Sequence, residues 1–360
     1  MAPLHIAVEA PAYVLIGLAS GELERIGGVI RNAQTKQVVM WLRDAGATPA
    51  QAFLGMTTAA SWLNLGVAAV GFALVIEKLN KLEKALQSLQ QITKEISDKI
   101  DLSFYANFRA AVDLAQNAFR MQQTHNRRTS AMTAINRFLE AQHIYSNLAR
   151  QQLPYKTKAI ATYLHTLYLA YVVEARCYLE LEELDTARQR LEAGYRELNQ
   201  LLRQYVDILL TDRPVIYLHP KLSPQVDLTR LTHIFRWKHQ NYRLTENEVF
   251  ELLRRTWLLN ENYDIHVGYW IDNLPPAVIS QTEIDRNLFG VTPAGREKVF
   301  QRLAETVNHI ESLLETDQRF LGYQLEVQAL QQQGVSFRAF QDLKPEGTSL
   351  PPVVYIYPES

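Results

Sequence analysis

The chain has 360 residues, of which 47% are hydrophobic and 21% charged, a balance typical of a folded globular protein of one large or two medium domains. Its 37 Lys and Arg residues nearly equal its 38 Asp and Glu residues, which argues against nucleic acid as a general electrostatic partner. The single cysteine, Cys177, excludes an intrachain disulfide framework.

The first 48 residues predict a small unit built on a β-hairpin. The stretches 23–31 and 37–42 are rich in β-branched residues, and 32–36 is expected to be the loop that joins them. The chain start lacks the basic region of a secretory signal and meets Glu9 and Pro11 early. We therefore expect the protein to be cytoplasmic as synthesised, and to reach a membrane or leave the cell only without a general secretory signal.

Residues 45–76 contain no charged side chain. A helix of about 20 apolar residues can cross a bilayer, and 52–76 is long enough to do so. Polar residues such as Thr57, Ser61 and Asn64 would weaken a permanent anchor. The pattern predicts a segment that is hidden in a soluble form and inserts into lipid on some trigger. The residues expected to enter lipid are Phe53, Leu54, Trp62, Leu63, Leu65, Val67, Val70, Phe72, Leu74, Val75 and Ile76.

Two alternatives remain open for this segment. A helix that is apolar on all sides can be the permanently buried centre of a large helical bundle. A permanent membrane span is the other alternative, because the uncharged length allows it.

The uncharged segment leads directly into an amphipathic run, and no proline occurs between Pro49 and Pro154. From 75 to 100, apolar residues alternate at spacings of four and three, with Thr93 as the one polar member, which is the seam of a coiled coil. The seam residues are Leu79, Leu82, Leu86, Leu89, Ile96 and Ile100. They predict packing within a long-helix bundle over 49–212, or else self-association or binding to a helical partner.

Further helices are expected over 104–121 and 131–151, separated by a charged break at 125–128 with Thr129 or Ser130 as the next cap. Residues 156–210 predict a pair of long helices. Within them, EARCYLELEELDTARQRLEAGYREL resembles a tetratricopeptide hairpin, with Glu182 where that family prefers glycine in the turn. The small and large packing positions of that family fall on Ala175, Tyr178, Ala187, Leu191 and Gly194. The resemblance covers one hairpin and therefore implies similar packing, not a peptide-binding array.

Residues 213–360 are expected to be a mostly helical C-terminal region with an extended tail at 344–360. It opens on an irregular stretch, 213–224, whose prolines flank the β-like run 215–218. Thr245 and Glu248 form a capping box, and Thr292 with Pro293 predicts the start of a last long helix that runs toward Gly334.

The sequence holds no grouping that points to catalysis. It has no phosphate-binding glycine loop, no zinc motif and no paired cysteines, so neither a cofactor nor a metal is expected and the protein is not expected to be an enzyme. Cys177 is expected to be a small core residue. Between 233 and 243, aromatic and basic residues alternate, and Arg236, Trp237, Lys238 and Arg243 are candidates for contact with an anionic surface. The alternative for this stretch is a solvent-facing helix with buried aromatic rings.

The fold expected is therefore mainly α, an elongated multi-helix bundle with long coiled-coil-type helices and a small N-terminal β-hairpin. This plan is similar to that of helical pore-forming toxins, and the likeness implies membrane disruption or attachment without chemistry. The partners expected are a lipid membrane, conditionally, and a second copy or a helical protein, with no specific nucleic acid. The first alternative is a soluble helical scaffold in which 52–76 is permanently buried, and the second is an enzyme of unfamiliar type.

Overall fold

The computed structural model describes residues 17, 20–26, 29–34, 38–41, 102–223, 225–258, 269–332, 334 and 336–337. These residues are mainly α-helical, as the sequence predicts. They belong to two compact units. One comprises Met1–Asn147, Leu164–Leu198 and Thr316–Ser360, and the other comprises Leu148–Tyr163 and Asn199–Glu315. We call them the first and second unit.

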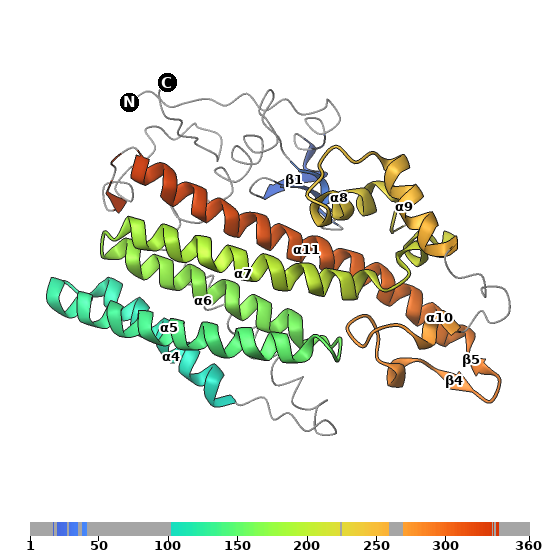
Figure 1. Cartoon of the computed structure of the whole chain (residues 1–360), viewed down its shortest axis with the longest axis horizontal. Helices are drawn as coiled ribbons and strands as arrows, with labels where there is room; N and C mark the ends of the chain where they lie inside the picture. Colours follow the sequence, from blue (N-terminus) through green and yellow to red (C-terminus); the bar gives the residue numbers. More distant parts are fainter. Residues whose placement is uncertain are drawn as a thin grey trace. The chain divides into compact units, whose positions relative to one another are not determined.

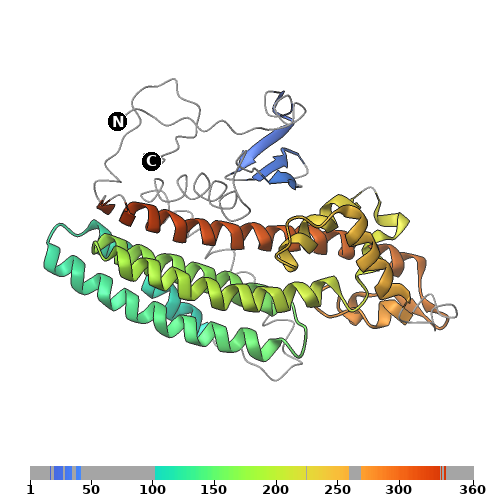
Figure 2. The ribbon, with the colours of Figure 1, turned by 45° about the horizontal axis from the view of Figure 1, so that its top comes forward.

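Long helices dominate the first unit. It contains α4, most of α5, most of α6, the first part of α7 and the last part of α11, which lie side by side in Figures 1 and 2. Their full bounds are Leu102–Arg120, Thr124–Gln152, Ala159–Glu180, Leu184–Leu210 and Pro293–Gln332.

Aromatic rings fill the space between these helices. Phe108 of α4 meets Phe138 and Tyr145 of α5 edge-on, with ring centroids 5.9 and 6.2 Å apart. Tyr168 of α6 meets Phe320 of α11 at 5.3 Å. Edge-to-face rings at these distances contribute a favourable interaction in addition to the free energy of burying their apolar surface. The helix predicted over 104–121 is confirmed as α4, which buries Phe108 and, one and two turns on, Val112 and Ala115.

The α6–α7 hairpin carries the tetratricopeptide-like packing predicted for it. Ala175, Ala187 and Leu191 are at most 2% exposed. Glu182 lies in the turn with φ of +61°, the left-handed conformation for which glycine is favoured, and this explains why the family prefers glycine there. Helix α7 approaches α6 closely at Gly194, where an added Cβ would lie 2.6 Å from the Tyr171 ring.

The N-terminal strands form a three-stranded antiparallel sheet and not the two-stranded hairpin expected. The order is β1 (Leu23–Ile26), β2 (Val29–Asn32) and β3 (Val38–Trp41), and Leu23 pairs with Asn32 and Val29 with Trp41. The stretch 23–31, expected to be one strand, contains β1 and most of β2. In the part of the chain that the structure describes, the two-stranded hairpin is instead C-terminal, at 286–291.

The second unit is made of shorter elements around the first part of α11. They are the 3₁₀ turns η2 (Pro214–Leu218), η3 (Pro220–Leu222) and η4 (Gln281–Glu283), the helices α8 (Leu228–Lys238), α9 (Glu246–Leu258) and α10 (Tyr269–Asp272), and the strands β4 (Arg286–Asn287) and β5 (Gly290–Val291). One face of α11 is buried, and its apolar residues are Val299, Leu303, Val307, Ile310 and Leu314.

Two local predictions were wrong. The β-like run 215–218 lies in the 3₁₀ turn η2, where Pro214 fixes the first turn and the Tyr217 hydroxyl donates to the Leu209 carbonyl at 2.6 Å. The charged residues 125–128 lie in the first turns of α5, which begins at Thr124. They are solvated there and include neither Pro nor Gly to end a helix, so charge alone does not break it.

Candidate functional site

The residues predicted to enter lipid, from Phe53 to Ile76, and the seam from Leu79 to Ile100 lie outside the described residues. Both assignments therefore stay predictions. Within the residues that are described, no helix is both long enough and apolar enough to cross a membrane.

The predicted anionic-surface cluster is placed in and after α8. Helix α8 begins at Asp227, whose carboxylate accepts from the Arg230 amide at 2.8 Å. Trp237 is 4% exposed, and the Arg203 guanidinium lies 4.9 Å above its ring. The indole is therefore part of the core of the second unit.

The basic members of this cluster are engaged to different extents. The Lys238 ammonium lies 2.6 Å from Asp207, and Arg236 donates to the Leu244 carbonyl at 2.7 Å. Arg243 is exposed. Two of the three cations thus already have an oxygen partner in the second unit, and an anionic surface would have to compete with that partner.

A buried polar network joins α5, α6 and α7 in the first unit. The fully buried Glu174 carboxylate accepts from Gln142 at 2.6 Å and from Arg190 at 2.7 Å, and Arg190 also donates to the Gln142 side-chain oxygen at 2.6 Å. Burial raises the pKa of Glu174, and the bonds from Arg190 and Gln142 oppose that rise. Each helix contributes one member, so the triangle fixes the register of the three helices.

The network continues one turn further along. The Tyr171 hydroxyl donates to Glu197 at 2.8 Å, and the Ser146 hydroxyl donates to the other oxygen of the same carboxylate. Gly194 makes room for the Tyr171 ring. Burial, with the bond to Glu197, raises the pKa of Tyr171 and keeps its hydroxyl protonated. These polar groups bind one another, which suits a structural role.

Cys177 is confirmed as a core residue. It is fully buried, and burial raises the pKa of its thiol, so it stays protonated. A thiolate is the reactive form of cysteine, and this side chain is therefore not an activated nucleophile. Among the residues described, no three His, Cys, Asp or Glu side chains cluster as a metal site would require.

In the second unit, a buried ion pair joins α8 to α11. Arg230 donates to both oxygens of Glu311, at 2.8 and 2.7 Å, and both side chains are about 8% exposed. The guanidinium also donates to Asn308 at 2.7 Å and to the Gln225 carbonyl. The pair is bidentate and nearly dry, and a charge left there alone would be costly.

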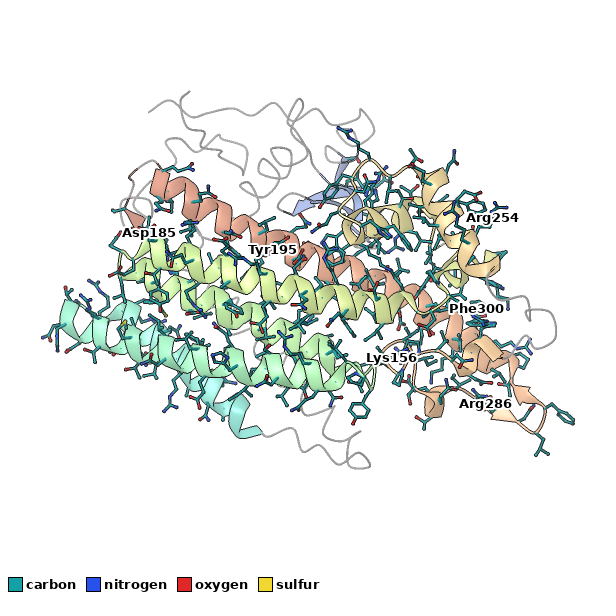
Figure 3. The ribbon with its side chains drawn as sticks, in the orientation of Figure 1. Lys156, Asp185, Tyr195, Arg254, Arg286 and Phe300 are labelled. Atoms are coloured by element: carbon teal, nitrogen blue, oxygen red, sulfur yellow. The ribbon has the colours of Figure 1, made fainter. Side chains whose placement is uncertain are left out.

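A second set of ion pairs supports the base of the β4–β5 hairpin. Glu283 accepts from Lys158 at 3.0 Å and from Arg302 at 2.8 Å. Beside it, Arg286, labelled in Figure 3, donates to Asp272 and to Gln281, each at 2.6 Å. Sequence reasoning missed this base, because its members are far apart in the chain.

The junction of the hairpin with α11 is equally fixed. The Thr292 hydroxyl lies 2.7 Å from the Asp285 carboxylate and accepts from the Gly295 amide at 3.0 Å, which makes it the predicted cap of α11. An added Cβ at Gly295 would lie 2.3 Å from the Asp285 carbonyl, so only glycine allows this approach.

The hairpin ends in two exposed apolar residues. Asn287 pairs with Gly290, and the two-residue turn between them is Leu288 and Phe289. Their exposed fractions are 100% and 97%. No local sequence signal distinguishes this pair from core residues, because bulky apolar residues are usually buried.

The ion pairs of Glu283 predict a specific acid sensitivity. Burial favours the neutral form, but the bonds from Lys158 and Arg302 outweigh it and lower the pKa of Glu283 to about 2. A depressed pKa contributes stability above the unfolded value near 4.5, and this is lost as the pH falls toward 2. Because solvent reaches these side chains, we expect Glu283→Gln to lower the free energy of unfolding by about 1 kcal/mol at pH 7.

The measurement is urea unfolding at pH 7 and pH 3. The Glu283→Gln variant should lose less stability between these pH values than the parent does, and Glu305→Gln, at an exposed neighbour of Arg302, serves as the control. Identical pH profiles for the parent and Glu283→Gln would contradict the assignment.

No protein-family model matches this chain. Neither a curated protein nor a solved structure is significantly similar to it.

Proposed function

We propose that this protein binds lipid membranes and disturbs them, by inserting the segment 52–76 from a state in which the helical body covers it. The observation that carries the proposal is the absence of any charged residue from Ala45 to Ile76 in a chain that is 21% charged. Transfer of apolar side chains from water is favourable both into a bilayer and into a protein core. Such a segment can therefore exchange between the two.

Two features of the segment favour conditional insertion. Gly55, Gly66 and Gly71 let helices approach closely in lipid, whereas each costs about 1 kcal/mol in a water-exposed helix. Thr57 and Asn64 make the segment less favourable in lipid than an ordinary anchor. The seam that follows, from Leu79 to Ile100, would support association of inserted copies.

The second candidate function is a helical interaction scaffold with 52–76 permanently buried. The same polar residues favour it, because a buried Asn64 would find hydrogen-bond partners in a bundle more readily than in lipid. The two candidates make opposite predictions for substitutions within the segment.

The test combines vesicle flotation, dye release and thermal melting of the full chain. A charge at the centre of a spanning helix costs about 2.5 to 3.5 kcal/mol, so Gly71→Asp should weaken insertion and dye release by about a hundredfold. Asn64→Leu should strengthen lipid binding. The control is Ala106→Asp on the exposed face of α4, which should change neither lipid binding nor dye release.

The scaffold predicts a different result. There, Asn64→Leu strands a buried hydrogen-bond partner at a cost of about 1 to 3 kcal/mol and lowers the melting temperature without a gain in flotation. If the parent protein does not float with vesicles of neutral or anionic lipid, and Asn64→Leu only lowers its melting temperature, membrane insertion is abandoned for the scaffold.

A further inference from the structure

The tip of the β4–β5 hairpin is unlike the rest of the described surface. Leu288 and Phe289 are 100% and 97% exposed, while the other large apolar side chains that the described residues expose are Met132, Tyr155 and Phe250, at 41 to 65%. A single exposed apolar residue is ordinary, but two adjacent ones with almost no contact to their own protein are not. The fold gains nothing from their side chains.

The turn itself does not require these residues. Two-residue hairpin turns favour Asn, Asp and Gly, which adopt left-handed backbone or bind nearby amides. Here those roles fall to the flanking residues. The Asn287 side-chain oxygen accepts from the Phe289 amide at 2.9 Å, and Gly290 takes a φ of +108°. Polar residues at 288 and 289 would serve the turn equally well, so the apolar pair needs another explanation.

The base of the hairpin is tied to the rest of the second unit at both of its ends. Arg286 ties the base of the hairpin to Asp272 and Gln281, and Thr292 ties its other end to Asp285. These bonds hold the base of the hairpin, and the two apolar side chains at its tip are exposed to water in this structure.

The size of the tip indicates which partner it fits. A stable protein interface buries about 800 Å² on each partner, whereas Phe, among the largest side chains, buries about 150 to 250 Å². Along the hairpin, the exposed residues before the tip are polar or charged, at Asp285, Arg286 and Asn287, and Val291 on the other strand is half-buried, so these residues add no fully exposed apolar side chain to the tip. A bilayer interface, in contrast, accepts a small convex apolar point without a matching pocket.

We propose that Leu288 and Phe289 enter the interfacial layer of a lipid bilayer and give the protein a reversible first hold on the membrane. The choice of lipid as the partner rests on the proposed function, in which the segment 52–76 inserts. The tip and the segment are separate parts of the chain, and either can be removed without the other.

The experiment places an environment-sensitive dye at the tip. Leu288→Cys is labelled through its thiol in the full chain, where the native Cys177 is fully buried and does not compete. Neutral phosphatidylcholine vesicles should shift the dye emission to the blue, and a quencher attached to the lipid chains should quench it. The same dye at Met132→Cys, on an exposed position of α5, should show neither change.

A second variant measures the contribution of the tip to binding. Leu288→Ser with Phe289→Ser should weaken vesicle binding by tenfold or more, since each side chain loses an apolar surface that it would bury in lipid. The fold should be unaffected, with an unchanged melting temperature.

The outcomes separate the two proposals. If the dye attached at position 288 still responds to vesicles in the Gly71→Asp variant, membrane contact by the tip is supported. Any loss of vesicle leakage in that variant is then due to the segment 52–76. If vesicles do not change the emission of the dye at position 288, the proposal that the tip enters the bilayer is wrong. Vesicle leakage that persists in that case still supports insertion of the segment 52–76. A dye response that appears without vesicles and grows with protein concentration also overturns the tip, since a second copy then covers it.

Discussion

We expect Arg230→Met to lower the free energy of unfolding by about 3 to 5 kcal/mol, the largest effect of any single substitution considered for this protein. The substitution removes a guanidinium that binds both oxygens of Glu311, together with Asn308 and the Gln225 carbonyl. Glu311 is then an isolated carboxylate at 8% exposure, and its desolvation is no longer compensated. Chemical denaturation at pH 7 measures the loss.

The control is Arg254→Met on α9, whose ion pair with Glu251 is about half exposed. An exposed pair contributes at most about 1 kcal/mol, so this variant should stay close to the parent. The double variant Arg230→Met with Glu311→Leu should recover much of the loss, because apolar side chains of similar volume carry no charge to desolvate. If the double variant is as unstable as Arg230→Met, the lost charge pairing is not the cause.

Local sequence signals predicted the second half of the fold well. Thr245 and Glu248 form the predicted capping box, with the Glu248 carboxylate accepting from the Thr245 amide at 2.8 Å. Thr292 caps α11, Pro293 opens it, and Gly334 follows its end with φ of +63°. Each of these signals acts over a few residues, so a sequence contains it completely.

Signals that depend on distant partners were missed or misjudged. The expected N-terminal hairpin is a three-stranded sheet, because the β-rich stretch 23–31 contributes to two strands, and composition alone does not say how such a stretch divides. The triangle of Gln142, Glu174 and Arg190 joins three helices. No spacing rule connects its members, and each looks like an ordinary polar helix residue in the sequence.

The two candidate sites also differ in whether the sequence alone reveals them. The uncharged segment 52–76 is visible from sequence because length and composition define it. The apolar tip at Leu288 and Phe289 is not, because apolar residues are usually buried and only the structure shows that these two are exposed. Composition therefore identifies a segment that lipid could accept, while the exposure of individual side chains needs the fold.

Glu174→Ala is expected to destabilise the first unit by about 3 kcal/mol. The carboxylate is fully buried and is the acceptor for both Gln142 and Arg190, so its removal leaves two donors without that partner and opens a cavity between α5, α6 and α7. The matched control is Glu140→Ala on α5, whose pair with Arg137 is about half exposed and should contribute little.

The pH dependence of Glu174 has the opposite sign to that of Glu283. Burial raises the pKa of Glu174, so the folded state favours the protonated form, and the stability that this contributes is present below the unfolded value near 4.5 and is lost as the pH rises. Glu174→Gln keeps a side chain of the same shape without that titration. On acidification from pH 7 to pH 4, the parent should therefore gain stability from protonation of Glu174, and the Glu174→Gln variant should lack this gain. Urea unfolding of both proteins at the two pH values measures the difference. A parent and variant whose difference in stability does not change with pH would show that the buried carboxylate is not destabilised in its charged form, and that Arg190 and Gln142 compensate its burial completely.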